Sequence, residues 1–200
     1  MDARTAFLGR YKNSLLDSVR AFSETDLERH ADIALQALSQ IKPKRCFTVI
    51  NLVSGRSLYP CPVNLNGIHA CHWGRAHKAA VQPWEDHYAG RLPEWSITHN
   101  EAGVRFLRAN PAPTFWQIGT LGSSAELEYR ADWSWEDVGI GGMGHVLMLR
   151  AQAEAMRELA AKNATTAYNI REGISATPKN GTPAYLYEQL LQEFERLAGR

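Results

Sequence analysis

Four side chains that commonly bind zinc lie within nine residues of one another: His69, Cys71, His72 and His77. Imidazole nitrogens and thiolate sulfurs are the usual ligands of protein zinc sites. The spacing matches no closed motif that pairs C-x2-C with H-x3-H, and the first three residues are too close in sequence to share one tetrahedron easily. A small metal site in block 69–77 is therefore an alternative hypothesis, and histidines at turns or subunit contacts are the favoured interpretation.

A cysteine and a histidine far apart in the sequence could form a nucleophilic pair. Cys71 lies in the run 67–73, and His145 follows Gly144. The arrangement loosely resembles cysteine amidases that cleave peptidoglycan, in which a histidine lowers the pKa of the thiol and takes its proton. His145, however, begins a segment with helical periodicity, and the sequence identifies no third residue to orient it. A Cys71/His145 amidase or peptidase acting on the cell wall is kept as the alternative function.

Two further patterns have simpler explanations than catalysis. Glu126 and Glu128 place two carboxylates on one face of an expected strand, which suits acid and base chemistry but is more often a solvated face. The glycine-rich run 139–144 precedes a helix, yet it lacks the Lys-Ser/Thr of a P-loop and the full dinucleotide fingerprint. A flexible turn or a contact loop is the favoured interpretation there. We therefore expect a protein that is not an enzyme, with no catalytic residue, no bound metal and no cofactor.

The composition is that of an ordinary globular protein. The chain has 200 residues, of which 44% are hydrophobic, so it can bury a core without disulfides. Its 22 basic side chains nearly cancel its 21 acidic ones, and this balance gives no reason to expect a membrane or sequence-specific nucleic acid as a partner. No signal peptide or long apolar run is visible, and the three cysteines are irregularly spaced. These features predict a cytoplasmic protein with reduced thiols, unless it leaves the cell inside a larger particle.

The N-terminal segment has the periodicity of amphipathic helices. The spacing predicts a first helix over residues 3–22 and a second over residues 24–41. Ser23 is the expected N-cap of the second helix, because its hydroxyl can accept a hydrogen bond from an early backbone N–H. Asp26 and its acidic neighbours complement the positive end of the helix dipole.

Helical periodicity returns in the C-terminal third of the chain. A stripe of apolar residues runs from Val146 to Ala160, after the glycine-rich run. A polar linker over residues 163–181 follows. Thr182 and Pro183 then supply an N-cap and a proline at the first helical position, which predicts a closing helix.

The middle of the chain has the alternation typical of strands. Residues 45–53 place Phe47, Val49 and Asn51 on one face, and Ser54-Gly55 is expected to fold them back as a hairpin. A turn of helix is expected at residues 84–88. The expected strands are 45–53, 57–59, 95–98, 103–107, 115–119 and 126–133.

This order of elements predicts an α+β fold. The expected helical bundle is built from residues 1–44 and 139–200, at the two ends of the chain. The expected antiparallel β-rich module, residues 45–138, is inserted between them.

Several segments resemble the head-to-tail adaptor proteins of tailed bacteriophages. The likeness begins with Thr25–Leu35, continues through Pro43 and covers the run from Phe47 to Pro60. Those neck proteins often begin with a helix followed by a hairpin that ends in proline. The other similar segments are Leu107–Gly119, Leu149–Ala160 and Leu186–Leu197.

The resemblance implies a structural virion protein of the neck, at the interface of head and tail. It implies a dodecameric ring of identical subunits that binds the portal protein of a filled capsid and offers its lower surface to a tail, tail-terminator or stopper protein. Assembly is expected in the host cytoplasm. We expect residues 163–200 to dock onto the portal. The expected contact residues are Tyr185, Leu186, Leu190, Phe194 and Arg196.

Overall fold

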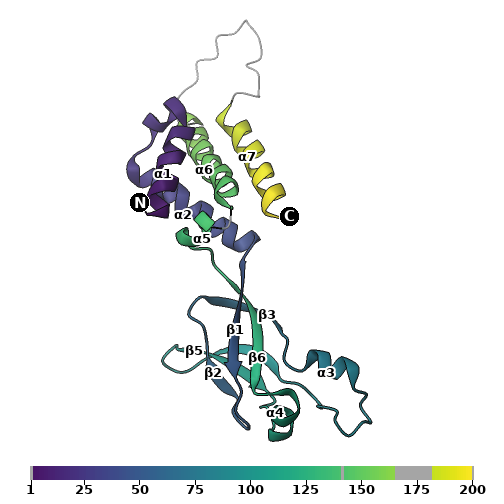
Figure 1. Cartoon of the computed structure of the whole chain (residues 1–200). Helices are drawn as coiled ribbons and strands as arrows, with labels where there is room; N and C mark the ends of the chain where they lie inside the picture. Colours follow the sequence, from purple (N-terminus) through teal and green to yellow (C-terminus); the bar gives the residue numbers. More distant parts are fainter. Residues whose placement is uncertain (1, 141, 165–181, 200) are drawn as a thin grey trace, which may run out of the picture. The chain divides into compact units, whose positions relative to one another are not determined.

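The computed structural model describes residues 2–140, 142–164 and 182–199, and it divides the chain into two compact units (Figure 1). The helical unit combines Met1–Pro43 with Trp133–Arg200, and the β unit is Lys44–Asp132. The α+β class expected from the sequence is confirmed.

The helical unit contains five α-helices and one 3-10 helix among its described residues. They are α1 (Ala3–Ser14), η1 (Leu16–Ala21), α2 (Glu24–Ile41), α5 (Trp135–Ile140), α6 (Gly144–Ala164) and α7 (Pro183–Ala198). The single helix expected over residues 3–22 is wrong. Leu16 adopts a φ of +52°, so α1 ends before it and the chain continues as a 3-10 turn. Positions 165–181 of the expected linker lie outside the described residues.

Helices α2 and α7 begin where the sequence predicted. The backbone N–H of Asp26 donates to the Ser23 hydroxyl at 3.2 Å, and the Asp26 carboxylate accepts from the Ser23 N–H at 3.0 Å. This reciprocal capping box satisfies two backbone donors that would otherwise have no partner. The Thr182 hydroxyl caps α7 by accepting from the Tyr185 N–H, and Pro183 lies in the first turn.

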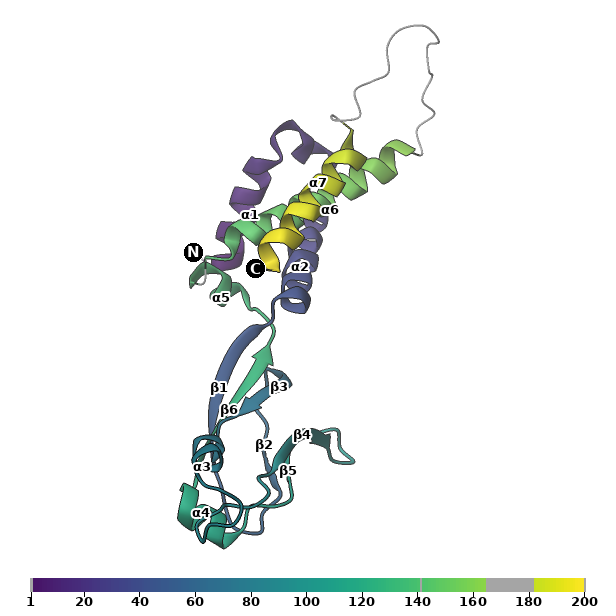
Figure 2. The ribbon, with the colours of Figure 1, turned by 90° about the vertical axis from the view of Figure 1, so that its right-hand side faces the viewer.

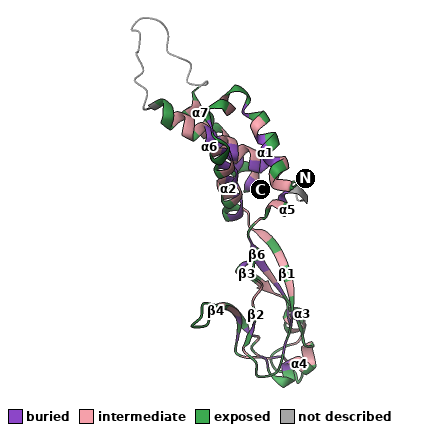
Figure 3. Cartoon of the chain, turned by 90° about the vertical axis from the view of Figure 1, so that its left-hand side faces the viewer, coloured by how far each residue is buried: buried purple, intermediate pink, exposed green. Residues whose placement is uncertain are grey.

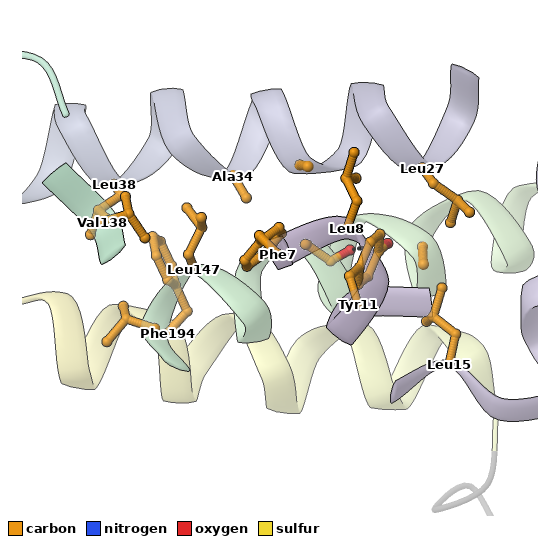
Figure 4. Packing of buried hydrophobic residues seen from close by; sticks show 14 of the residues in the cluster. Phe7, Leu8, Tyr11, Leu15, Leu27, Ala34, Leu38, Val138, Leu147 and Phe194 are labelled. Atoms are coloured by element: carbon orange, nitrogen blue, oxygen red, sulfur yellow. Dashed lines mark hydrogen bonds between the residues drawn. The ribbon is translucent and has the colours of Figure 1, made fainter. Parts of the chain in front are cut away.

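The core of the helical unit forms where α1, α2, α6 and α7 meet (Figure 4). Helix α6 packs along both α2 and α7. Small residues on α6 allow this close approach, because alanine side chains add little between helix axes. The fully buried members of this core are Phe7, Tyr11, Ala31, Ala34, Leu38, Leu147, Ala151, Ala155 and Phe194.

The β unit contains six strands and two short helices. They are β1 (Lys44–Asn51), β2 (Leu58–Pro60), β3 (Leu65–Cys71), α3 (Arg75–Ala80), β4 (Glu94–His99), β5 (Arg105–Asn110), α4 (Phe115–Leu121) and β6 (Ser124–Ala131). Strands β1, β6 and β3 form one antiparallel sheet in that order, and β2, β5 and β4 form another (Figure 2). The inner faces of both sheets meet in one core that includes Tyr59, Leu65, Leu107 and Leu127.

The hairpin expected about Ser54-Gly55 is wrong. A turn does occur there, with Gly55 at a φ of +74° and the Arg56 N–H donating to the Val53 carbonyl at 3.1 Å. The turn carries the chain from one sheet to the other, so β1 and β2 do not pair. The Tyr59 hydroxyl stabilises this crossing by donating to the Arg56 carbonyl at 2.9 Å, while its ring lies in the core.

The strand expected at residues 115–119 is also wrong, because these residues form α4. The Gln117 N–H donates to the Thr114 hydroxyl at 3.1 Å, and the Gln117 side chain accepts from the Thr114 N–H at 3.0 Å. This is the same capping box as in α2, with glutamine at the third helical position. The helical turn expected at residues 84–88 is instead a pair of successive turns.

Candidate functional site

The closing helix α7 holds all five residues expected to contact a portal. Phe194 is only 1% exposed and its ring lies 6.0 Å from the Arg150 guanidinium, so this side chain fixes α7 in the helical core. Leu186 is exposed, and Arg196 is an exposed ion-pair partner of Glu193. Tyr185 and Leu190 are half-buried. A contact with a portal stays a prediction, and Leu186 and Arg196 are the members most open to a partner.

A buried polar chain connects α1, α2 and α6 inside the helical unit. The Tyr11 hydroxyl donates to the Ala151 carbonyl at 2.8 Å and lies 3.1 Å from Nδ1 of His30. The Nε2 atom of His30 lies 2.8 Å from the Glu158 carboxylate. His30 is 2% exposed, and Glu158 also forms an ion pair with Arg29 at 2.6 Å. Because its members belong to three helices, no local sequence pattern predicted this hydrogen-bonded network.

Cys71 and His145, the pair considered for amidase chemistry, belong to different units. Cys71 ends β3 in the β unit, and His145 is exposed in the first turn of α6 in the helical unit. Burial raises the pKa of the Cys71 thiol above its ordinary value of 9.0, despite the opposing effects of the Trp73 backbone, Trp95 and Arg75. A nucleophilic cysteine requires the opposite shift, since the thiolate is the reactive form.

The other residues of the block 69–77 have separate partners. The Nε2 atom of His72 lies 3.1 Å from the Glu128 carboxylate, and His77 donates to the carbonyl of His87 at 2.8 Å. His69 is exposed. In the part of the chain that the structure describes, no three His, Cys, Asp or Glu side chains are placed to hold one metal ion. A cavity of about 320 Å³ lies beside this block, lined by Cys71, Trp73 and Trp95 among others.

Strand β1 is an edge strand, and much of it is exposed or half-buried (Figure 3). Phe47 is 68% exposed and Val49 is 55% exposed, while Ile50 of the same strand is buried in the core. The alternation expected from the sequence is present, and the face with Phe47 and Val49 is the outer one. On β6, Glu128 lies opposite Phe47 and Glu126 lies opposite Val49, so the two carboxylates border this apolar patch.

A second exposed apolar surface lies at the start of α4. Phe115 is 82% exposed and Trp116 is 53% exposed. Their backbone is held firmly, because the buried Gln117 side chain donates to the carbonyls of Ala89 and Arg91 at 2.9 and 2.8 Å. We call Phe115 and Trp116 the aromatic tip. The sequence pattern predicts a strand at these residues, so the aromatic tip was not expected.

Comparisons with protein-family models, with curated proteins and with solved structures found no match for this chain. Among the described residues, no helix is both long enough and apolar enough to cross a bilayer. Among the exposed apolar side chains of the β unit, we take those of β1 and the aromatic tip as candidate contact sites, together with the closing helix of the helical unit.

Proposed function

We propose that this protein is a structural adaptor, and specifically a subunit of the head-to-tail neck of a tailed phage. The observation that carries the proposal is the edge of β1, where large apolar side chains are exposed beside unpaired backbone groups. Such an edge is a ready template for pairing with another chain, and natural proteins usually cover or charge it. A protein that keeps it open is suited to assembly.

The aromatic tip supports the same function. Interface hot spots are enriched in aromatic side chains that a rigid scaffold holds ready for a partner. The capping box of α4 and the buried Gln117 side chain provide that scaffold for Phe115 and Trp116.

In the proposed role, the two units serve different partners. The helical unit docks onto the portal through the C-terminal region that includes α7, and the β unit contacts neighbouring subunits or the tail. Two different contact surfaces on one subunit suit a closed ring, because ring contacts join unlike faces of adjacent copies. The dodecameric ring and the tail partner follow from the sequence resemblance.

Portal binding is the direct test. Portal rings of the phage that encodes this chain are mixed with the full chain and with a version truncated after Lys162, and the mass of each mixture is measured. We expect the full chain to add to the portal ring and the truncated chain to fail, while amide exchange of the β unit stays unchanged. Equal binding by both chains would contradict docking through residues 163–200, and no binding by the full chain would contradict the adaptor itself.

A further inference from the structure

The hydrogen-bond register of β1 identifies which of its backbone groups are unpaired. The Leu52 N–H donates to the Ser123 carbonyl at 2.7 Å. From this pair, the register of β1 with β6 continues residue by residue along both strands. In an antiparallel ladder, every second residue directs its N–H and C=O toward the neighbouring strand. Thr48 and Ile50 therefore face β6, and the backbone groups of Arg45, Phe47, Val49 and Asn51 point to the open edge.

The same residues present their side chains on the outer face of the sheet. Arg45 and Asn51 are exposed at the two ends of the strand, and Phe47 and Val49 are exposed between them. The order along the edge is polar, apolar, apolar, polar. Such an order is complementary to itself when the strand is reversed.

We propose that a second copy of this chain pairs its β1 with this edge, antiparallel and about a two-fold axis at Thr48. Phe47 then lies opposite Val49 of the second copy, and Arg45 lies opposite Asn51 of the second copy. The four facing pairs exchange about eight backbone hydrogen bonds. The β1-β6-β3 sheets of the two copies then form one six-stranded sheet. Both apolar pairs pack across the new seam between the copies.

The alternative registers fit less well. A shift by two residues in one direction places Arg45 opposite Val49 of the second copy, and a shift in the other direction places Phe47 opposite Asn51. Each mixes polar with apolar side chains and shortens the ladder. The two-fold register at Thr48 keeps like character together and puts no like charges opposite each other, which is why a second copy is the occupant.

This dimer goes beyond the proposed function. A two-fold contact closes on itself, so it cannot repeat around a ring that joins unlike faces. We therefore expect the dimer in the free protein, where it covers an edge of β1 that would otherwise promote aggregation. Portal docking through the C-terminal region and dimer formation through β1 depend on different residues, so either can fail without the other.

The test compares three full-length proteins by sedimentation over a range of concentrations. We expect the natural chain, of 22.4 kDa, to reach twice that mass. The variant Phe47→Lys/Val49→Lys places like charges across the seam, and we expect its dimer dissociation constant to rise by about tenfold or more. Within its own sheet the new lysines face Glu128 and Glu126, so the variant should stay folded.

The variant Phe47→Lys/Val49→Glu removes the same apolar surface but places lysine opposite glutamate across the proposed seam. We expect it to dimerise more tightly than the double-lysine variant. A natural chain that remains monomeric, a dimer that persists unchanged in the double-lysine variant, or equal dissociation constants for the two variants would each overturn the proposal. Portal binding, measured on the same proteins, reports separately on the adaptor function.

Discussion

The hydrogen-bonded network of Tyr11, His30 and Glu158 has a defined direction. The one hydroxyl proton of Tyr11 goes to the Ala151 carbonyl, so the Tyr11 oxygen is left to accept from Nδ1 of His30. Nε2 of the same ring faces the Glu158 carboxylate. Both ring nitrogens of His30 therefore have a partner, and a buried polar network of this kind is stabilising only when every member has a partner.

Replacing Tyr11 by phenylalanine tests this network. The variant removes the hydrogen bonds of Tyr11 to the Ala151 carbonyl and to one nitrogen of His30, while the ring still fills the core. A buried group that loses its hydrogen bond costs about 1–3 kcal/mol. We expect that loss in the unfolding free energy of the helical unit, measured by amide exchange, with β-unit amides as the internal control. Tyr185→Phe on α7, where the ring is half-buried, should change this unfolding free energy little.

Glu158 gives the helical unit a dependence on pH. Burial alone would raise its pKa, but hydrogen bonds from Lys162 and His30 outweigh burial and lower the pKa below the ordinary value of 4.5. Arg29 faces the same carboxylate. A carboxylate with a lowered pKa in the folded state contributes stability above its unfolded pKa, and this contribution disappears as the pH falls through the folded-state value.

We therefore expect Glu158→Gln to destabilise the protein at neutral pH and to reduce the loss of stability below pH 4.5. Urea unfolding at a series of pH values measures both effects. Glu188→Gln, which changes an exposed carboxylate on α7, is the matched control and should leave the curve nearly unchanged. A variant curve parallel to that of the natural chain at all pH values would contradict the assignment.

Helices and strands could be predicted best from the sequence where a local signal decides the structure. The caps at Ser23 and Thr182 lie within three residues of the groups they satisfy, so α2 and α7 could be located from the sequence. The same capping box was present at Thr114 and Gln117, but a Pro-rich connector and β-prone residues made the segment look extended. A search for the capping box itself would have identified α4.

Strand pairing could not be predicted in the same way. The glycine turn after β1 is compatible with a hairpin, and only the distant β6, more than seventy residues later, decides that β1 pairs elsewhere. The alternation of Phe47 and Val49 was predicted, but which face is exposed depends on what the second sheet covers. The aromatic tip and the network around His30 were missed for the same reason, since both depend on contacts between separate elements.

Helix α4 should depend strongly on its cap. The Gln117 side chain accepts from the Thr114 N–H and donates to two carbonyls, so Gln117→Ala removes three hydrogen bonds, of which the one to the Ala89 carbonyl is buried. We expect a loss of more than about 1 kcal/mol in the stability of the β unit, measured by amide exchange. Thr114→Ala, which removes only the hydroxyl cap, should cost about 1 kcal/mol. Equal losses in both variants would show that the two carbonyl contacts contribute nothing.

The β unit begins and ends at neighbouring positions. Lys44 at the start of β1 pairs with Ala131 at the end of β6, so the chain enters and leaves the unit side by side. Its core is made of its own residues, from Ile50 to Ala131. The described residues of the helical core likewise all belong to their own unit, although they come from both ends of the chain.

The two units should therefore fold separately. We expect an excised fragment of residues 44–132 to show cooperative unfolding with the circular dichroism of a β protein. A chain that joins residues 1–43 to 133–200 through a short glycine linker should fold as a helical protein, because the ends to be joined lie beside each other across one strand pair. Each prediction is contradicted if its fragment lacks a cooperative transition.

The same fragments separate the surfaces proposed for assembly. The edge of β1 lies wholly within residues 44–132, so the excised β unit should dimerise with the affinity of the full chain, and the joined helical protein should remain monomeric and retain portal binding. Sedimentation of each fragment, alone and with portal rings, measures both properties. Because β1 and the C-terminal region lie in different units, a dimer formed by the helical protein would assign self-association to helices, and portal binding by the β fragment would reverse the proposed orientation of the adaptor.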